Sequence, residues 1–310
     1  MALLAIEIRN FSKNYGSVAA VKNLSLQIKS GELFGLIGPD GAGKTTTMRT
    51  LTTLLTCEQG EMYVAGKDVR TEVPYIRSIL GYMPQRFSLY PDLTVIQNLN
   101  FFADLFGVSG EERKQRLERL FQFSRLDAFK KRLAKDLSGG MKQKLALSCI
   151  LIHAPRILIL DEPTTGVDPV SRQEFWQILN QLRQEGATIL VSTPYMDEAS
   201  LCDRVAFMHK GSLLALDKPD NLHKEFPYVL YEVTGPDTRL LVPYLQKETG
   251  AVAVRKFGDR LHVSFGRKLN ETQMQHLREK APAQIANFES IRPSIEDVFL
   301  ELMKKQEALS

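Results

Sequence analysis

The stretch GPDGAGKTT, residues 38–46, decides the fold that the sequence predicts. It follows the apolar run LFGLIG and precedes residues 45–55, which have the apolar spacing of a helix. A glycine-rich turn between a buried strand and a helix presents backbone N–H groups to an anion, and the helix N-terminus adds partial positive charge. This pattern is typical of a phosphate-binding loop, and it predicts an α/β fold of the P-loop NTPase type.

Each position of this loop has an expected role toward a nucleoside triphosphate. Lys44 neutralises β- and γ-phosphate oxygens, Thr45 offers its hydroxyl to Mg²⁺, and Thr46 donates to the α-phosphate. The alternative interpretation is a flexible glycine-rich turn without a ligand. The loop residues that we expect to bind nucleotide are Gly38, Asp40, Gly41, Ala42, Gly43, Lys44, Thr45 and Thr46.

Two carboxylates follow a second apolar run. Asp161 and Glu162 directly follow the run ILIL, residues 157–160. The carboxyl ends of parallel strands lie at the same end of a sheet as a P-loop. We expect Asp161 to hold Mg²⁺ and Glu162 to act as general base toward the attacking water, because in-line phosphoryl transfer needs both groups positioned. The alternative is that both carboxylates merely cap the strand.

The remaining pattern divides the chain into two domains, 1–225 and 226–310. Residues 3–37 are rich in strand patterns and predict an antiparallel β subdomain. Amphipathic helices form an expected insertion at about 86–140, after which helix and strand alternate as in a parallel sheet. Residues 226–310 follow the order of a split βαβ unit, which predicts a small ferredoxin-like α+β domain.

Composition limits the classes of function. The net charge is +4, with 40 basic residues dispersed among 36 acidic ones, so charge indicates no nucleic-acid partner. The three cysteines lack metal-site spacing and suit a reducing compartment. No apolar run approaches the roughly 20 residues that a spanning helix needs, and the opening residues lack the basic segment of a secretion signal. We therefore expect a cytoplasmic protein.

The motif LSGGM, residues 137–141, narrows the class. Ser138 is placed to cap a helix whose glycines expose N–H groups to a second anion, and an ordinary helix cap is the alternative. Together with the phosphate loop and the DE strand, this motif resembles the ATP-binding subunits of ABC transporters over residues 3–220. The resemblance implies ATP and Mg²⁺ as cofactors, and it implies that Ser138, Gly139 and Gly140 contact the ATP held by a second ATP-binding subunit.

Three further positions match motifs of this family. Tyr15 matches the aromatic residue that stacks on adenine, with an ordinary turn tyrosine as the alternative. Gln85, in GYMPQ, matches the glutamine that ligates Mg²⁺ or positions water, which makes Thr45, Gln85 and Asp161 the implied metal ligands. Asp168, in GVDP, matches an aspartate at the seam between two ATP-binding subunits, with a simple turn as the alternative.

Two positions depart from the family pattern. Met141 replaces the usual glutamine of the SGG motif, and Pro194 replaces the histidine expected in VSTPYMDEA. Proline offers neither an imidazole nor a backbone N–H to the γ-phosphate. We expect impaired or asymmetric hydrolysis, and the sequence leaves open whether Pro194 slows hydrolysis or abolishes it.

Among ABC families, the chain resembles the ATPases of bacterial exporters with small six-helix permeases, a group that includes daunorubicin-type and YbhF-like proteins. The resemblance implies two membrane permease subunits and a second ATP-binding subunit, in a homodimer or a heterodimer, at the inner face of the cell membrane. One alternative is a nucleotide-gated regulatory or scaffold subunit with a degenerate ATP site. Another is an ABC ATPase that acts on ribosomes or DNA. The cargo is not readable from this chain.

Overall fold

The computed structural model describes residues 3–86 and 89–308. The chain divides into two compact units, Met1–Pro219 and Asp220–Ser310, and each is described by itself. Residues 87 and 88, which belong to the expected helical insertion, lie outside the described residues, as do residues 1–2 of the first expected domain and 309–310 of the second.

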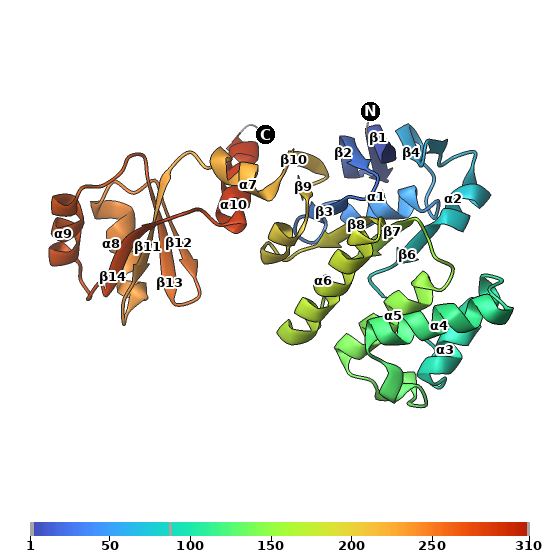
Figure 1. The fold of residues 1–310 in the computed structure, drawn as a ribbon. Helices are drawn as coiled ribbons and strands as arrows, with labels where there is room; N and C mark the ends of the chain where they lie inside the picture. Colours follow the sequence, from blue (N-terminus) through green and yellow to red (C-terminus); the bar gives the residue numbers. More distant parts are fainter. Residues whose placement is uncertain (1–2, 87–88, 309–310) are drawn as a thin grey trace. The chain divides into compact units, whose positions relative to one another are not determined.

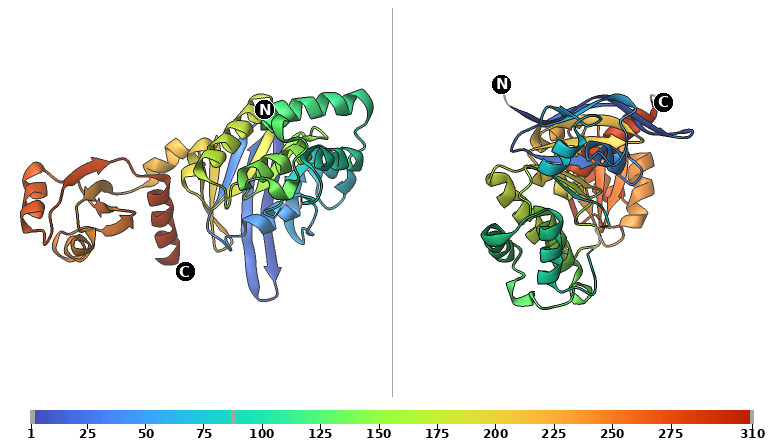
Figure 2. Two further views of the ribbon diagram at one scale, coloured as in Figure 1. Left: turned by 90° about the horizontal axis from the view of Figure 1, so that it is seen from below. Right: turned by 90° about the vertical axis from the view of Figure 1, so that its right-hand side faces the viewer.

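An antiparallel sheet opens the first unit, in the strand order β2-β1-β4-β5. Alternating burial along β1 and β2 places their apolar residues on one face. Figure 2 shows these two strands as the long blue arrows of one hairpin. The expected antiparallel subdomain is confirmed for the first two strands of the strand-rich opening, whereas residues 33–37 belong to the mostly parallel sheet. The strands are β1 (Leu4–Tyr15), β2 (Val18–Lys29), β4 (Gln59–Val64) and β5 (Lys67–Asp68).

A six-stranded sheet in the order β10-β9-β3-β8-β7-β6 carries the phosphate loop. All neighbours in it are parallel except β10 and β9. β3, β7 and β8 are buried along their whole length, which explains their continuous apolar sequences. The strands are β3 (Leu33–Ile37), β6 (Leu80–Met83), β7 (Ile157–Asp161), β8 (Thr188–Thr193), β9 (Arg204–His209) and β10 (Ser212–Asp217).

Helices complete the first unit (Figure 1). α3, α4 and α5 share one hydrophobic cluster that includes Leu99, Leu120 and Leu145, so the insertion has a core of its own. Thr94 and Gln97 begin α3 with a reciprocal capping box. The helices are α1 (Lys44–Leu51), α2 (Val73–Ile79), α3 (Val95–Leu105), α4 (Gly110–Ser124), α5 (Gly139–Leu151) and α6 (Pro169–Gln184).

The second unit is built on a four-stranded antiparallel sheet in the order β12-β13-β11-β14. One helix connects β11 to β12 and another connects β13 to β14, so the elements have the expected order. The core includes Tyr231, Leu245 and Val263. The elements are β11 (Val229–Thr234), α8 (Thr238–Glu248), β12 (Ala253–Phe257), β13 (Arg260–Phe265), α9 (Glu271–Lys280), β14 (Asn287–Ile291) and α10 (Ile295–Ala308).

A buried polar cluster fastens α10 to this sheet. Asp297 is fully buried, and its carboxylate lies 2.9 Å from His262 Nδ1. The Ser294 hydroxyl and backbone N–H also donate to this carboxylate, at 2.6 and 2.9 Å. Burial by itself raises the pKa of Asp297, but the hydrogen bonds from His262 and Ser294 outweigh burial, so the pKa lies below its ordinary value of 3.8.

This lowered pKa makes the stability of the second unit depend on pH. At pH 7, Asp297→Asn is expected to cost about 1–3 kcal/mol, because an amide NH₂ then faces donors. A carboxylate with a lowered pKa stabilises above its unfolded pKa and loses that contribution as pH falls through the folded one, so the difference between wild type and variant begins to narrow below about pH 4. Calorimetric unfolding between pH 7 and 3, with exposed Asp259→Asn as control, measures it. A gap as large at pH 3 as at pH 7 contradicts the assignment.

Two expectations about elements were wrong or incomplete. The helix after the phosphate loop ends at Leu51 and not at Leu55, because Thr53 adopts a left-handed φ of 61°. The hairpin of β9 and β10 was not predicted. Its turn has positive φ at Lys210 and Gly211, as a tight hairpin requires.

Candidate functional site

The phosphate loop joins the buried strand β3 to α1 through a tightly packed backbone. Gly41 and Gly43 have φ of 75° and 100°, a region that suits glycine. A side chain at Gly38 would place its Cβ 2.2 Å from the carbonyl oxygen of Met208, and one at Gly43 would meet that of Ala20 at 2.5 Å. Packing therefore requires glycine at 38 and 43, and the backbone conformation favours it at 41 and 43.

Lys44 opens α1 and is almost fully buried, with 3% of its surface exposed. Its ammonium donates to the carbonyl oxygens of Gly38 and Pro39 at 2.7 and 3.1 Å. It also forms an ion pair of 3.1 Å with Glu162. A buried cation is stable only with such partners. The loop therefore fixes one positive charge at the point where phosphate oxygens were expected.

Asp161 ends β7 and is fully buried. Its Oδ1 accepts from Thr45 Oγ1 at 3.2 Å and from Ser192 Oγ at 2.7 Å. Its Oδ2 has no hydrogen-bond partner among the residues that the structure describes. Burial is the main reason that the pKa of Asp161 is raised. A buried acceptor without a partner, beside a threonine hydroxyl, fits the oxygen ligands that Mg²⁺ prefers.

Glu162 adopts a left-handed backbone, with φ of 50°, a strained conformation that marks functional sites. Its N–H donates to Ser192 Oγ at 3.0 Å, which holds the residue in place. The carboxylate accepts from Gln85 Nε2 at 2.8 Å and from Thr165 Oγ1 at 3.4 Å, besides its ion pair with Lys44. The structure thus brings the expected base and the expected glutamine into direct contact.

A cavity of about 880 Å³ opens over these groups, a size typical of small-molecule sites. The hairpin residues Val18 and Ala20 and the side chains of Lys22 and Lys210 also line it. Tyr15 pairs with Val18 at the end of the hairpin and is 49% exposed, but it is not among the described residues that line the cavity. The lining includes the expected residues Asp40, Gly41, Ala42, Gly43, Lys44, Thr45, Thr46, Gln85 and Glu162.

Comparison with known proteins identifies the family. A family model described as ABC transporter matches residues 21–165. A Nod factor export ATP-binding protein I from Cupriavidus metallidurans is 35% identical over 310 residues, an alignment that covers 97% of this chain and 98% of the relative. This chain belongs to the ABC transporter ATP-binding proteins.

Two other similar proteins bear on this ABC ATPase domain. The probable multidrug ABC transporter ATP-binding protein YbhF of Escherichia coli K12 is 49% identical over 217 residues, which cover 70% of this chain but only 38% of the relative. An ATP-binding cassette solved as a dimer in a post-hydrolysis state, bound to ADP and Pi, has a TM-score of 0.62 and 28% identity, covering 69% of this chain and 98% of that one. The P-loop fold of the ABC ATPases is thereby established.

The SGG motif of this ABC ATPase does not line the nucleotide cavity of its own chain, judged on the described residues. Ser138 caps α5 as expected, because its side chain accepts from Met141 N at 3.3 Å, and both Ser138 and Gly139 are exposed. Gly140 is buried against α6, where a Cβ would lie 2.3 Å from Ser171 Oγ. This packing gives the second glycine a structural role apart from any ligand.

Asp168 begins α6 and is exposed. Its carboxylate accepts from the backbone N–H of Ser171 at 3.0 Å, and this hydrogen bond is the main reason that the pKa of Asp168 is lowered. Asp168 is therefore the N-cap of the helix that packs against Gly140. Like the SGG motif, it lies outside the described lining of the nucleotide cavity.

Pro194 follows β8 and adjoins a buried network that the sequence did not reveal. Glu198, 2% exposed, accepts from Thr193 Oγ1 at 2.5 Å and from Thr164 Oγ1 at 2.9 Å. Arg172 of α6 adds an ion pair of 3.1 Å and also stacks on Tyr195. One carboxylate thus ties the segment after Glu162, the end of β8 and α6 together.

The sequence also missed Ser192, which bonds both Asp161 and the backbone of Glu162. This contact depends on the register of β7 and β8, which pairs Asp161 with Ser192 and which local sequence patterns do not specify.

Within residues 3–86 and 89–308, no helix has the length and apolar character that crossing a bilayer requires.

Asp161→Asn is expected to stabilise the protein in metal-free buffer while it weakens the nucleotide site. A neutral amide retains an acceptor for Thr45 and Ser192 but carries no buried charge, so the melting temperature rises by about 2–4 °C at pH 7. Because the pKa of Asp161 is raised, protonation of wild type removes its burial cost, and the gain shrinks as pH falls. Thermal unfolding in EDTA at pH 7 and 5 measures both effects. A less stable variant contradicts the assignment.

Proposed function

We propose that this chain is the ATP-binding and ATP-hydrolysing subunit of an ABC exporter, which acts with two separate membrane permease subunits and a second ATP-binding subunit. The observation that carries the proposal is the contact set of Lys44, Thr45, Asp161, Glu162 and Gln85, all of which except the fully buried Asp161 line one cavity. The names of the relatives, probable multidrug transporter and Nod factor export protein, support export. Their differing cargoes support a cargo site in the permeases.

The residues divide the work of hydrolysis as follows. The loop N–H groups and Lys44 hold the β- and γ-phosphates of ATP and stabilise the charge that develops on the γ-phosphate. Glu162 takes a proton from the attacking water, and Gln85 orients it through the 2.8 Å hydrogen bond. Because the Glu162 carboxylate also contacts Lys44 and Thr165, it exchanges at least one of these contacts for water during turnover.

Mg²⁺ fits the oxygen donors of this site. Thr45, Asp161 and Gln85 are the proposed ligands, and Asp161 Oδ2 is the buried acceptor that lacks a protein partner in the described chain. When bound, the ion neutralises phosphate charge.

The second ATP-binding subunit completes the site in this proposal. Ser138, Gly139 and Asp168 are exposed, so a partner subunit can reach them, and the N-terminus of α5 suits a γ-phosphate. Tyr15, exposed at the end of the β1–β2 hairpin, is the proposed adenine contact. ATP then joins two subunits and its hydrolysis separates them.

The second unit is proposed to be a ferredoxin-like accessory domain. Its order strand, helix, strand, strand, helix, strand and its sheet order β12-β13-β11-β14 support this assignment. We place the domain boundary at 225 and 226, and the subunit at the cytoplasmic face of the membrane beside its permeases.

A second candidate function rests on Pro194. A proline at this position cannot donate to the γ-phosphate, which favours a nucleotide-gated regulatory or scaffold subunit whose catalytic partner hydrolyses ATP. The intact contact set around Glu162 favours a subunit that hydrolyses ATP itself.

Nucleotide binding separates these proposals from a purely structural role. Titration calorimetry of the full-length chain with MgATP is expected to show saturable binding that Lys44→Ala abolishes, because the ammonium that the phosphate loop itself holds is then lost. ATP turnover by the same protein then distinguishes the transport ATPase from the regulatory subunit. If folded wild-type protein does not bind MgATP, both proposals are contradicted.

A further inference from the structure

A second cavity, of about 570 Å³, lies in the first unit where the parallel strands of the six-stranded sheet begin, at the end of the sheet opposite the phosphate loop. It is lined by Ser30 before β3, Ile79 before β6, Arg156 before β7 and Thr188 at the start of β8. The phosphate loop follows the carboxyl end of β3, so this cavity, here called the amino-edge pocket, is remote from the nucleotide. The two cavities share no lining residue within the described chain.

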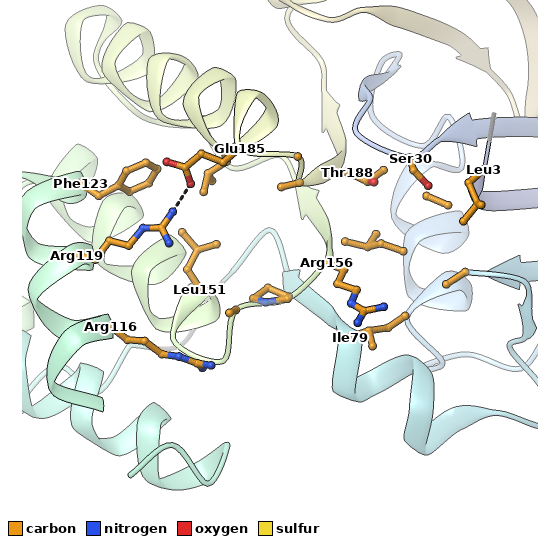
Figure 3. Close-up of a pocket in the computed structure, with 18 of the residues that line it drawn as sticks. Leu3, Ser30, Ile79, Arg116, Arg119, Phe123, Leu151, Arg156, Glu185 and Thr188 are labelled. Carbon is orange, nitrogen blue, oxygen red and sulfur yellow. Dashed lines mark hydrogen bonds and ion pairs between the residues drawn. The ribbon is translucent and has the colours of Figure 1, made fainter. Parts of the chain in front are cut away.

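Two different layers form the walls of the amino-edge pocket (Figure 3). Leu120 and Phe123 of α4 come from the helical insertion and Leu151 from α5, which packs against it, whereas Ile157 and Leu182 belong to the core. These walls are predominantly apolar and surround a cavity that is open to solvent, as the walls of small-molecule sites do. A molecule seated there would contact the core and the insertion together.

Three guanidinium groups border this apolar space. Arg116 donates to the carbonyl of Ile152 at 2.7 Å and to Glu112 at 2.5 Å, and Arg119 is paired with Glu185. Arg156 is exposed, and among residues 3–86 and 89–308 no carboxylate lies within ion-pair distance of it. Figure 3 shows Arg156 beside Ile79, across the pocket from Arg116 and Arg119 on α4.

We propose that the amino-edge pocket binds an amphipathic monoanion, an organic carboxylate or sulfonate with an apolar body. Arg156 supplies one guanidinium that is not matched by protein charge, and its planar fork suits a single oxyanion headgroup. The apolar walls bury the body of the ligand and supply most of its affinity. Arg116 and Arg119 already form ion pairs, so only the charge of Arg156 remains for a ligand to balance. The proposed ligand therefore carries a single negative charge.

A matched pair of fluorescent probes tests this assignment on the full-length chain. 8-Anilinonaphthalene-1-sulfonate is an aromatic monoanion, and N-phenyl-1-naphthylamine has the same rings without the charge. Fluorescence titration, with and without saturating MgATP, is expected to show one saturable site for the sulfonate under both conditions. Displacement of the sulfonate by MgATP, or no saturable binding, would overturn the proposal, since the probe would then occupy the nucleotide cavity or no site at all.

Variants locate the site. Arg156→Gln is expected to weaken the sulfonate at least about tenfold and to leave the uncharged probe within about twofold, because only the headgroup contact is lost. Ala187→Phe, which fills the pocket from its partly exposed rim, removes both probes. Arg278→Gln, an exposed arginine of α9, is the matched control and changes neither.

The outcomes decide the proposal in each case. Equal sulfonate affinity for wild type and Arg156→Gln shows that the cation does not hold the headgroup and overturns it. Undiminished binding by a folded Ala187→Phe places the probe elsewhere and has the same effect. If Ala187→Phe does not fold, Arg156→Glu, a surface change, replaces it and must abolish sulfonate binding while the uncharged probe still binds.

Discussion

Replacing Glu162 with glutamine is expected to lower the rate of ATP hydrolysis by about 10²–10⁴-fold while MgATP remains bound. Glutamine preserves the size of the side chain but cannot take a proton from water. In the structure, the carboxylate contacts Gln85, Thr165 and Lys44, so the change also removes an ion pair beside the phosphate loop. Because that ion pair competes with phosphate for Lys44, its loss does not weaken the hold on ATP.

Three measurements check this expectation. Steady-state phosphate release gives the rate, calorimetry gives the affinity for MgATP, and light scattering after size exclusion gives the mass with and without ATP. The variant is expected to remain dimeric with ATP, since the joined state is no longer resolved by hydrolysis. Glu118→Gln, an exposed change on α4, serves as control. Wild-type turnover by Glu162→Gln would remove this residue from the chemistry, and lost MgATP binding would assign it a structural role.

The second large effect is expected from Pro194→His, which should raise ATP turnover at least about tenfold without changing the affinity for MgATP. A histidine at the end of β8 adds a donor toward the γ-phosphate, and single preorganised donors of this kind change rates by about 10²–10³-fold. The substitution leaves unaltered the hydrogen bond from the Thr193 hydroxyl to Glu198, which holds this segment in place.

Pro194→Ala distinguishes the imidazole from the backbone. It removes the proline ring and restores an N–H but adds no side-chain donor, so its turnover is expected to stay near wild type. An equal gain in both variants would assign the effect to the backbone. No gain in either would show that position 194 does not limit hydrolysis in this chain.

Most of the nucleotide site could be predicted from local sequence, because its residues lie in short stretches at strand ends. Lys44, Thr45, Asp161, Glu162 and Gln85 meet as expected once the sheet is formed. A phosphate loop and a DE strand each define their own geometry over a few residues. The sheet then needs only parallel neighbours to bring them together.

The supporting residues could not be predicted in the same way. Ser192 reaches Asp161 only through the register of β7 and β8, and Glu198 joins the nearby end of β8 to the distant stretches at Thr164 and Arg172. The contacts of Glu198 depend on how those stretches pack, which local patterns do not specify. The β9–β10 hairpin did carry a local signal, a Lys210–Gly211 turn between apolar runs.

Glu198 has a mechanical consequence for this molecule. Its one buried carboxylate is the common anchor of Thr164, Thr193 and Arg172. If any of these three residues is displaced, the other two must therefore move with it or a hydrogen bond to the buried carboxylate must break. We therefore expect the loop at Pro194 and the helix capped by Asp168 to move together rather than independently.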